Sequence, residues 1–588
     1  MTIFGGMFGY ATPRGLDKDA CRALGNAISR VADDPRETFA DEQCCLVKAD
    51  IGAYGEPADH RGADGTVGIL VGEPLLAEGE AADRPDRGAD LRRLHESWLA
   101  GDYGVLKRAH GTFAAAHYDP KRKRLAITAD KLGVRPVYWW NGPGIIVFAS
   151  ALRILEALDF VPKVMDLRGT AETIAFGFPL GRRTQYRAIF CLDAGEILEV
   201  TKDGPRSETY WRWDRLDEQS LAPDVAVREL HKTFGSAIAR RLRPDETSAI
   251  CFLSGGLDSR CIATELVGQG KTVHSFNFSW LGTYDQVLST DYAEGLGTRH
   301  HQSHRELTVN THPVAYLGQA VSDAVSDPAF RPERPRMVFS GDGGSGGLGH
   351  AHMNREMVED LRAGRPGSAV CRFTRYNKVG LPLRFMSARA RRVLLATVSD
   401  GIANELSRFE CDDRGRNIHV FLLLNDQRRH LAAHFENIDT ARFEMQLPFF
   451  DSGVLEAVYR TPLDELLRHR FYYKWLEEFP KVVTSVPWQS YPNHLPCPLP
   501  MPEGYQNQWE YDGVDVGLTK PSDYARQLRA AISDAAFPSR LWSGLRLWLA
   551  LLMTAWGVRD YSYALQDALT SHDIARKCDQ PSDLYEPV

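Results

Sequence analysis

The sequence predicts an α+β N-terminal domain followed by an α/β domain with a parallel sheet and a helical C-terminal part. Two patterns along the 588 residues support this prediction. Short apolar runs separated by turn residues fill the first 210 or so residues, whereas strand and helix signals alternate after about Asp214. Such alternation is typical of parallel strands with helices on both faces. A chain of this length is also too long for one hydrophobic core.

The N-terminal region is predicted to be built mainly from short strands. Apolar runs of strand length occupy 112–118, 124–128 and 145–149. Gly, Pro, Asp and Asn residues separate these runs, as expected of turns. A helix is expected at about 90–99.

The second region is predicted to begin with a helix, because apolar residues recur at helical spacing over 224–243. Strands are then expected at 249–253, 273–278 and 336–340, and helices at 259–268 and 284–296. After about Asn354 the pattern is mostly helical. We therefore place the domain boundary after residue 213, which divides the chain into 1–213 and 214–588.

Composition excludes several classes of partner. The net charge of −7 offers no broad basic surface, so neither nucleic acid nor membrane is expected as a partner. The apolar stretch at 547–556 is far shorter than the roughly 20 residues that span a bilayer. The ten cysteines are scattered, without a CxxC pair, which predicts reduced thiols and a cytoplasmic protein.

The stretch CFLSGGLDSR at 251–260 carries the strongest functional signal. A parallel strand that ends in a glycine-rich turn and opens a helix makes an anion site, since the helix amides point outward there. Glycines admit a phosphate to the backbone, hydroxyl groups add donors, and an Asp can hold a bridging Mg²⁺. The loop has no GK[ST], so it is not a Walker loop. A tight turn without a ligand is the alternative.

The motif SGGLDS resembles the pyrophosphate-binding loop of the asparagine synthetase family and its ATP-pyrophosphatase relatives. Resemblance continues at HSFNFSW, FSGDGGSGGLGH, QLPFFD and YYKWLEEFP, which begin at residues 274, 339, 446 and 472. In the first region, GTFAAAHYD, LAITADKLGVRPVYWW and FASALRILEAL resemble the glutamine-amidotransferase domain of the same proteins. The resemblance implies an amidotransferase-like β-sandwich at 1–213 and an ATP-pyrophosphatase domain at 214–588.

The resemblance also implies ligands and site residues. ATP would be cleaved between its α- and β-phosphates, and the residues expected to bind it are Leu253, Ser254, Gly255, Gly256, Asp258, Ser259, Phe276, Asn277, Phe278, Ser340 and Gly341. Asp258 would also hold Mg²⁺, and Lys474 would contact the phosphates. Asp342 stands where the family has a catalytic glutamate, and we expect it to deprotonate an incoming amine.

Three departures from the family pattern bear on the reaction. Thr2 stands where glutamine-hydrolysing members carry a nucleophilic Cys. VGEPLL lacks the Asn that usually precedes Gly72, and no RGPD clamp lies near Arg61. These changes predict a degenerate amidotransferase domain retained as a scaffold, although Thr can also act as such a nucleophile. Ser345 replaces a second Mg²⁺ carboxylate, which leaves the metal site one acidic ligand short.

Without released ammonia, the nucleophile would be an amine that the substrate brings. GDGGSGGLGH is similar to the loop of lasso peptide cyclases, which are macrolactam synthetases. We therefore expect an AMP-forming ligase that adenylates an Asp or Glu side chain of a precursor peptide and joins it to the N-terminal amine. Its partners would be a ribosomally made precursor peptide and a leader-peptide protease. The alternatives are a small-molecule ligase of the asparagine or β-lactam synthetase type, and a binding protein without catalysis.

Overall fold

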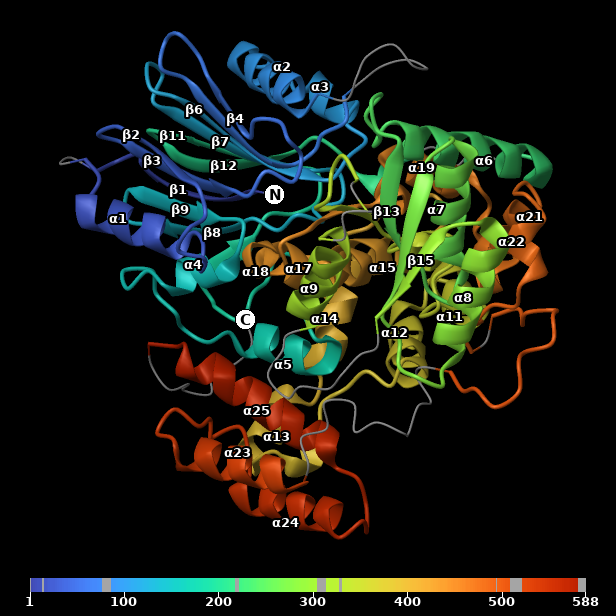
Figure 1. Cartoon of the computed structure of the whole chain (residues 1–588). Helices are drawn as coiled ribbons and strands as arrows, with labels where there is room; N and C mark the ends of the chain where they lie inside the picture. Colours follow the sequence, from blue (N-terminus) through green and yellow to red (C-terminus); the bar gives the residue numbers. More distant parts are fainter. Residues whose placement is uncertain are drawn as a thin grey trace.

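The computed structural model describes residues 2–12, 15–76, 86–216, 221–303, 313–326, 330, 332–492, 494–507 and 521–579. The N-terminal half contains two antiparallel sheets, and the C-terminal half contains a parallel sheet surrounded by helices (Figure 1). Sheet residues end at Thr209 in the first half, and the first long helix of the second half begins at Pro223.

Each antiparallel sheet has six strands. The first has the order β10-β8-β9-β1-β3-β2, and its strands are β1 (Thr2–Gly9), β2 (Arg36–Ala40), β3 (Cys44–Asp50), β8 (Tyr138–Gly142), β9 (Ile145–Ala149) and β10 (Ile189–Cys191). The second has the order β12-β11-β7-β6-β5-β4, and its strands are β4 (Asp59–Arg61), β5 (Val67–Gly72), β6 (Phe113–Asp119), β7 (Arg124–Ala129), β11 (Glu196–Thr201) and β12 (Gly204–Thr209). Apolar side chains of both sheets, including Phe4, Phe148 and Ile127, form one buried core between them.

Helices cover the outer faces of this sandwich. α2 (Arg87–Ala100) places Leu91, Leu94 and Trp98 against the second sheet, at the spacing of one helical face. The Asp86 side chain caps its first turn, and Gly101 ends it in a left-handed conformation. α1 (Lys18–Ala27) covers the first sheet through Leu24. The other short helices of this half are α3 (Gly104–Lys107), α4 (Leu152–Glu156) and α5 (Leu167–Phe176).

The parallel sheet has the strand order β15-β14-β13-β16-β17. Its strands are β13 (Ser248–Phe252), β14 (Thr272–Asn277), β15 (Arg299–Gln302), β16 (Met337–Phe339) and β17 (Glu444–Gln446). Helices α6 (Pro223–Ala239), α7 (Leu257–Gly268), α8 (Tyr284–Leu296) and α9 (Pro313–Val325) connect or cover them. The predicted alternation of strand and helix is confirmed, and the buried strands are rich in apolar residues, as expected of a sheet covered on both faces.

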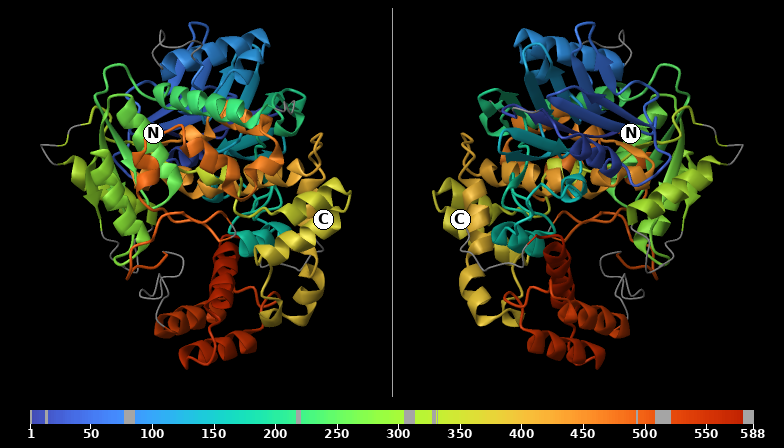
Figure 2. Two further views of the ribbon diagram at one scale, coloured as in Figure 1. Left: turned by 90° about the vertical axis from the view of Figure 1, so that its right-hand side faces the viewer. Right: turned by 90° about the vertical axis from the view of Figure 1, so that its left-hand side faces the viewer.

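The remainder of the second half is mostly helical, as predicted. Its helices are α10 (Gly344–Gly347), α11 (Arg355–Arg362), α12 (Pro366–Tyr376), α13 (Ala388–Leu394), α14 (Thr397–Leu406), α15 (Arg416–Leu422), α16 (Arg428–His430), α17 (Ala432–Glu436), α18 (Ile438–Ala441), α19 (Ser452–Arg460), α20 (Leu463–Leu466), α21 (Arg470–Leu476), α22 (Val482–Ser485), α23 (Pro521–Ser533), α24 (Gly544–Ala555) and α25 (Ser562–Arg576). The last three lie together with α13 at one end of the molecule (Figure 2). Within the described ranges, no helix combines the length and apolar character that crossing a bilayer requires.

A buried ion cluster joins the two halves. Asp451, fully buried at the start of α19, accepts hydrogen bonds from Arg240 (2.7 Å) and Arg241 (2.8 Å). His110, from the first half, lies 3.2 Å from the same carboxylate. Although burial opposes ionisation, the two guanidinium groups hold the pKa of Asp451 well below its usual range. The carboxylate is therefore charged throughout the neutral range.

We expect Asp451→Asn to lower the free energy of unfolding by about 3–5 kcal/mol at neutral pH, because it leaves buried guanidinium groups without their counter-charge. Urea titration followed by circular dichroism measures the change. Asp464→Asn is the control, since exposed pairs such as Asp464–Arg362 contribute less than about 1 kcal/mol. The pKa of Asp451 is lower in the folded state than in the unfolded state, where it is about 4. The stabilisation that Asp451 contributes is therefore fully present above about pH 4, and it is lost as the pH falls through the folded-state pKa. Equal effects of the two variants would contradict the assignment.

Candidate active site

A cavity of about 670 Å³ opens at the carboxyl ends of β13, β14 and β16. β13 lies at the centre of the sheet, and the chain continues from it to β14 on one side and later returns to β16 on the other. Loops that leave neighbouring strands in opposite directions separate at this point and leave room for a ligand. The cavity therefore lies where the topology of a parallel sheet predicts a binding site.

The first glycine-rich loop connects β13 to α7 and forms one wall of the cavity. Ser254 N–H donates to Ser259 Oγ at 2.9 Å, and Gly256 N–H donates to Ser254 Oγ at 3.2 Å. Leu253, Ser254, Asp258 and Ser259 line the cavity, and Gly256 lines a smaller cavity beside it. The loop thus brings these predicted residues together at the N-terminus of α7, where the helix dipole favours an anion.

Gly255 is the predicted loop residue that lines neither cavity. Its N–H donates to Asp285 Oδ1 at 2.7 Å, so a carboxylate already takes the hydrogen bond that we expected a phosphate to accept. Asp285, in the first turn of α8, also accepts a hydrogen bond from Gln489 (3.1 Å), and burial raises its pKa. Asp285 lines the cavity but was not predicted as a site residue; its only signal in the sequence is an acidic side chain at the start of a helix.

The second glycine-rich loop, at 340–346, packs directly against the first. A Cβ atom on Gly341 would lie 2.7 Å from Ser259 N, and one on Gly344 would lie 2.5 Å from Asp258 Cγ. Both distances are well inside van der Waals contact, so the two loops can meet only where these positions are Gly. Ser340 and Gly341, which we expected to bind ATP, line the cavity.

Asp258 lies between the two loops and lines both cavities. Its carboxylate accepts hydrogen bonds from the Tyr472 hydroxyl (2.6 Å) and from the N–H (2.9 Å) and hydroxyl (3.0 Å) of Ser345. Burial raises the pKa of Asp258, and the negative charge of Asp342 raises it further. Two carboxylates that repel each other across one cavity fit Mg²⁺, which is usually held by one or two carboxylates together with phosphate oxygens and water.

One wall of the cavity is aromatic. Phe252, Phe276 and Phe278 line it, and the rings of Phe252 and Phe278 meet edge to face with centroids 5.4 Å apart. Asn277 Nδ2 donates to Leu253 O at 2.9 Å, which joins the end of β14 to the end of β13. An aromatic wall of this kind suits the base of a nucleotide. The predicted nucleotide-binding residues of β14 are therefore in the cavity.

Asp342 and His430 form a second pair in the lining of this cavity, in a region that we call its histidine end. His430 Nε2 lies 3.2 Å from Asp342 Oδ1, and the Ser340 hydroxyl donates to Asp342 Oδ2. The hydrogen bond to Asp342 raises the pKa of His430. Burial opposes ionisation of Asp342, but the hydrogen bond to His430 lowers the pKa of Asp342 overall. The His430 side chain is 60% exposed and lines the cavity. His430 was not predicted, because it lies 88 residues after Asp342.

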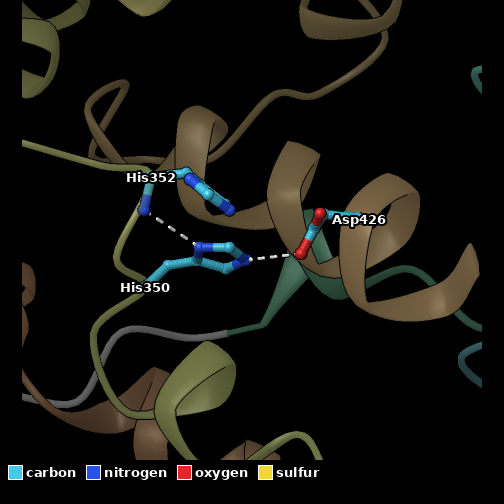
Figure 3. Close-up of side chains that lie close together, drawn as sticks. All are labelled: His350, His352 and Asp426. Atoms are coloured by element: carbon cyan, nitrogen blue, oxygen red, sulfur yellow. Dashed lines mark hydrogen bonds and ion pairs between the residues drawn. The ribbon is translucent and has the colours of Figure 1, made fainter. Parts of the chain in front are cut away.

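His350, His352 and Asp426 complete the histidine end (Figure 3). Asp426 lies in a π-helical turn, Leu423–Gln427, between α15 and α16, and such turns are frequent at functional sites. His350 Nε2 lies 3.1 Å from Asp426 Oδ2. Burial opposes ionisation, but the hydrogen bond to His350 lowers the pKa of Asp426 to about 2, so this carboxylate is charged at neutral pH.

The hydrogen bonds of this cluster fix the protons on its rings. His350 Nδ1 accepts the backbone N–H of His352 (3.3 Å), so its Nε2 carries the proton and donates it to Asp426. Asn377 Nδ2 donates to the carbonyl groups of His352 and Phe373. Asn377 Oδ1 therefore accepts a hydrogen bond from His352 Nδ1 (2.9 Å), which carries the ring proton of His352. The ligand atoms of the three side chains lie within 4.8 Å of one another, and a metal ion could bind there only by displacing the proton between His350 and Asp426. As described, the three side chains form a hydrogen-bonded wall.

The structure does not bring Lys474 to the cavity. Its side chain is 47% exposed, and its Nζ lies 3.5 Å from Glu465. In the part of the chain that the structure describes, no Lys or Arg lines either cavity. The charge on a bound pyrophosphate must therefore be offset by other groups.

Two histidines line the smaller cavity of about 100 Å³ beside the first loop. The rings of His469 and His494 have centroids 3.7 Å apart, and His469 has a φ of 62°, rare for a residue other than Gly. The buried Nδ1 of His494 has no hydrogen-bond partner among the described residues. Burial lowers the pKa of His494 to about 4 and that of His469 well below its usual value. An anion in this cavity would find imidazole donors and would favour their protonation.

We expect His494→Phe to raise the KM for pyrophosphate in ATP–pyrophosphate exchange roughly tenfold or more. The reason is that a hydrogen bond to a charged group contributes about 1.5–3 kcal/mol. Lys474→Met is the matched comparison and should leave this KM nearly unchanged. A raised KM in Lys474→Met with an unchanged KM in His494→Phe would show that Lys474, and not His494, binds the pyrophosphate.

Thr2 begins β1 and is 1% exposed. Its hydroxyl donates to Asp50 Oδ2 (2.9 Å) and accepts from Arg87 Nη2 (2.6 Å). Arg87 is fully buried and also donates to the Gly72 and Leu70 carbonyl groups. The Thr2 hydroxyl is thus held between a guanidinium group and a carboxylate, an arrangement that favours the scaffold interpretation of this domain.

Known families match both halves of the chain. The family described as "Glutamine amidotransferase domain" matches residues 93–211, and the family described as "Asparagine synthase" matches residues 229–476. Asparagine synthetase [glutamine-hydrolyzing] 3 of Bacillus subtilis is 26% identical over 33% of this chain and 32% of its own length. Asparagine synthetase [glutamine-hydrolyzing] 3 of Arabidopsis thaliana is 25% identical over 47% of this chain and 46% of its own length.

The chain spans between 32% and 57% of the length of the first curated relatives it matches. A solved structure described as the allosteric regulatory enzyme of purine biosynthesis aligns over 55% of this chain and 88% of its own, with 12% identity and a TM-score of 0.25, which is too low to bear on the fold. The two family matches follow each other in the order of the two halves described above. Residues 93–211 therefore belong to the glutamine amidotransferase domain family, and residues 229–476, which follow them, belong to the asparagine synthase family.

Proposed function

We propose that this chain is an ATP-dependent macrolactam synthetase of the lasso peptide cyclase type. It would adenylate the side-chain carboxylate of an Asp or Glu in a precursor peptide and join it to the N-terminal amine of the same peptide, releasing AMP and pyrophosphate. The observation that carries the proposal is the Thr2–Arg87 contact, which argues against glutamine hydrolysis by this domain. If ammonia is not released there, the amine has to arrive with the substrate.

The first step is activation of the acid. A carboxylate oxygen of the peptide attacks the α-phosphorus of ATP, and the bond to the β-phosphate oxygen breaks. Negative charge grows on the departing pyrophosphate, where the α7 N-terminus, Ser254, Ser259 and the two histidines of the smaller cavity can donate hydrogen bonds. Asp258 would hold a Mg²⁺ that offsets part of this charge.

The second step is amide formation. The peptide amine attacks the adenylate carbonyl carbon, the bond to AMP breaks, and the amine loses a proton. We assign that proton to Nδ1 of His430, whose Nε2 is held by Asp342. Asp342 itself, with its lowered pKa, is a weaker base than we expected from the sequence. Holding amine and adenylate in one cavity makes the step effectively unimolecular.

A small-molecule amide ligase is the second candidate. It is favoured by the similarity to proteins named asparagine synthetases. Such an enzyme would activate free aspartate or a short β-amino acid and would need no peptide.

The experiment supplies ATP and Mg²⁺ with either free aspartate or a candidate precursor peptide and its protease. A core peptide that has lost the mass of one water, together with AMP and pyrophosphate, supports the macrolactam synthetase. AMP formation with aspartate and added ammonium, in the absence of peptide, supports the small-molecule ligase. Formation of ADP would contradict both candidates.

A further inference from the structure

An apolar cavity of about 160 Å³ adjoins the histidine end of the active-site cavity. Aromatic and aliphatic side chains line it: Phe176, Phe178, Leu180, Phe373, Val379 and Phe421. They come from α5 and the segment after it, from α12 and the segment after it, and from α15. His352 and Asp426 line this cavity as well as the active-site cavity, so the two spaces share a wall.

The aromatic rings form a packed lining. The ring centroids of Phe176 and Phe178 are 5.9 Å apart, those of Phe176 and Phe373 are 6.5 Å apart, and those of Phe373 and Phe421 are 5.7 Å apart. Centroid distances of 4.5–7 Å are those of favourable aromatic contacts. Another ring or branched side chain entering this space would meet further aromatic faces and edges.

The polar groups around this lining are already used within the protein. Asn425 Oδ1 accepts Gly181 N–H (2.7 Å), and its Nδ2 donates to Phe421 O (3.0 Å). Asn377 is engaged by His352 and Phe373, as described above. The charged Asp426 carboxylate and His352 lie in the wall shared with the active-site cavity, and the remainder of the lining is aromatic and aliphatic apart from these two engaged amides. An apolar occupant is therefore favoured.

The volume fits one side chain. A dry apolar cavity of about 150 Å³ is large enough to hold benzene, so a cavity of about 160 Å³ accommodates a phenyl ring or a branched aliphatic group. It is too small for a second folded segment. The shared wall at His352 and Asp426 places such a group beside the histidine end, where we have placed the incoming amine.

We infer that this cavity is a specificity pocket that binds one aromatic or branched aliphatic side chain of the substrate peptide, close to the residues that are joined. The inference rests on the proposed function, because it takes the ligand of the neighbouring cavity to be a peptide. Free aspartate would have no group to fill the pocket. The substrate class is thereby narrowed to acids or amines that carry a bulky apolar side chain near the reacting group.

The first test measures binding without catalysis. Saturation-transfer NMR with N-acetyl-phenylalaninamide should give a signal with the native protein, and N-acetyl-alaninamide should give at least about tenfold less. Ala175→Phe fills the pocket from α5 and should abolish the difference, whereas Ala175→Ser should retain it. Val379→Phe fills it from the other side and serves as a second variant, with circular dichroism as the check on folding. Equal signals for the two probes, or a preference that survives both filling variants, would overturn the pocket.

The second test measures substrate selection. ATP–pyrophosphate exchange should be stimulated at least about tenfold more by aspartyl-phenylalaninamide than by aspartyl-glycinamide, and Ala175→Phe should remove this preference without changing the KM for ATP. Exchange without any preference would overturn the pocket and leave the ligase proposal standing. No exchange with any acid, despite a positive NMR result, would overturn the ligase proposal and the substrate role of the pocket with it.

Discussion

Asp258→Asn is expected to reduce ATP–pyrophosphate exchange by a factor of about 10²–10³. The change removes the negative charge that would hold Mg²⁺ while keeping the size and most of the hydrogen bonds of the side chain. The Ser345 N–H donates to one carboxylate oxygen and the Tyr472 hydroxyl to the other. In Asn the amide oxygen can keep the Ser345 hydrogen bond while the amide N–H donates to the Tyr472 hydroxyl, so the two loops should stay together. The effect therefore reports on charge and not on packing.

The matched control is Asp291→Asn, an exposed carboxylate on α8 outside the cavities. It should leave exchange and thermal stability unchanged. Calorimetry with Mg·ATP completes the measurement, and Asp258→Asn should bind it more weakly than the native protein. ATP–pyrophosphate exchange at the native rate in Asp258→Asn would show that Asp258 does not hold the metal, and it would weaken the assignment of the cavity to ATP.

His430→Gln should slow amide formation by a factor of about 10²–10⁴ and leave ATP–pyrophosphate exchange within a few fold of the native value. A general base contributes a factor of this order, and it acts only after the adenylate has formed. Rapid quench followed by mass spectrometry of the peptide measures the second step. Equal loss of both activities would show that His430 acts in activation or in folding, and not as the base.

Asp342→Asn provides the pH test of the same pair. Asp342 raises the pKa of His430, so the native rate of amide formation should rise with pH through a midpoint above the usual value for His of about 6.5. With Asn at position 342 the charge is lost, the pKa of His430 falls, and the midpoint should move to lower pH while the maximal rate decreases. An unchanged midpoint would separate His430 from the catalytic step.

Local sequence patterns were sufficient for most of the fold. α8 was predicted at 284–296 and is found there, and β13 and α7 lie within two residues of the expected positions. The reason is that apolar periodicity and glycine-rich turns act over a few residues. Residue order also predicted the first loop, since Ser254, Asp258 and Ser259 reach the cavity through one strand-to-helix turn.

Contacts between distant segments were not predictable in this way. Lys474 points to Glu465 instead of the phosphate site, because the orientation of α21 is set by its packing and not by its sequence neighbours. His494 lies beside the first loop although well over 200 residues separate them. A single sequence carries no local signal for such pairings.

Residue patterns alone were enough to predict the order of the two domains, the strand–loop–helix unit of the proposed ATP site and the absence of Cys at position 2. The tertiary structure alone decided which side chains meet around that unit: His430 with Asp342, Asp285 with the Gly255 amide, and Arg87 over Thr2. The physical reason is that backbone conformation follows from neighbours along the chain, whereas the chemistry of a cavity depends on how separate elements pack.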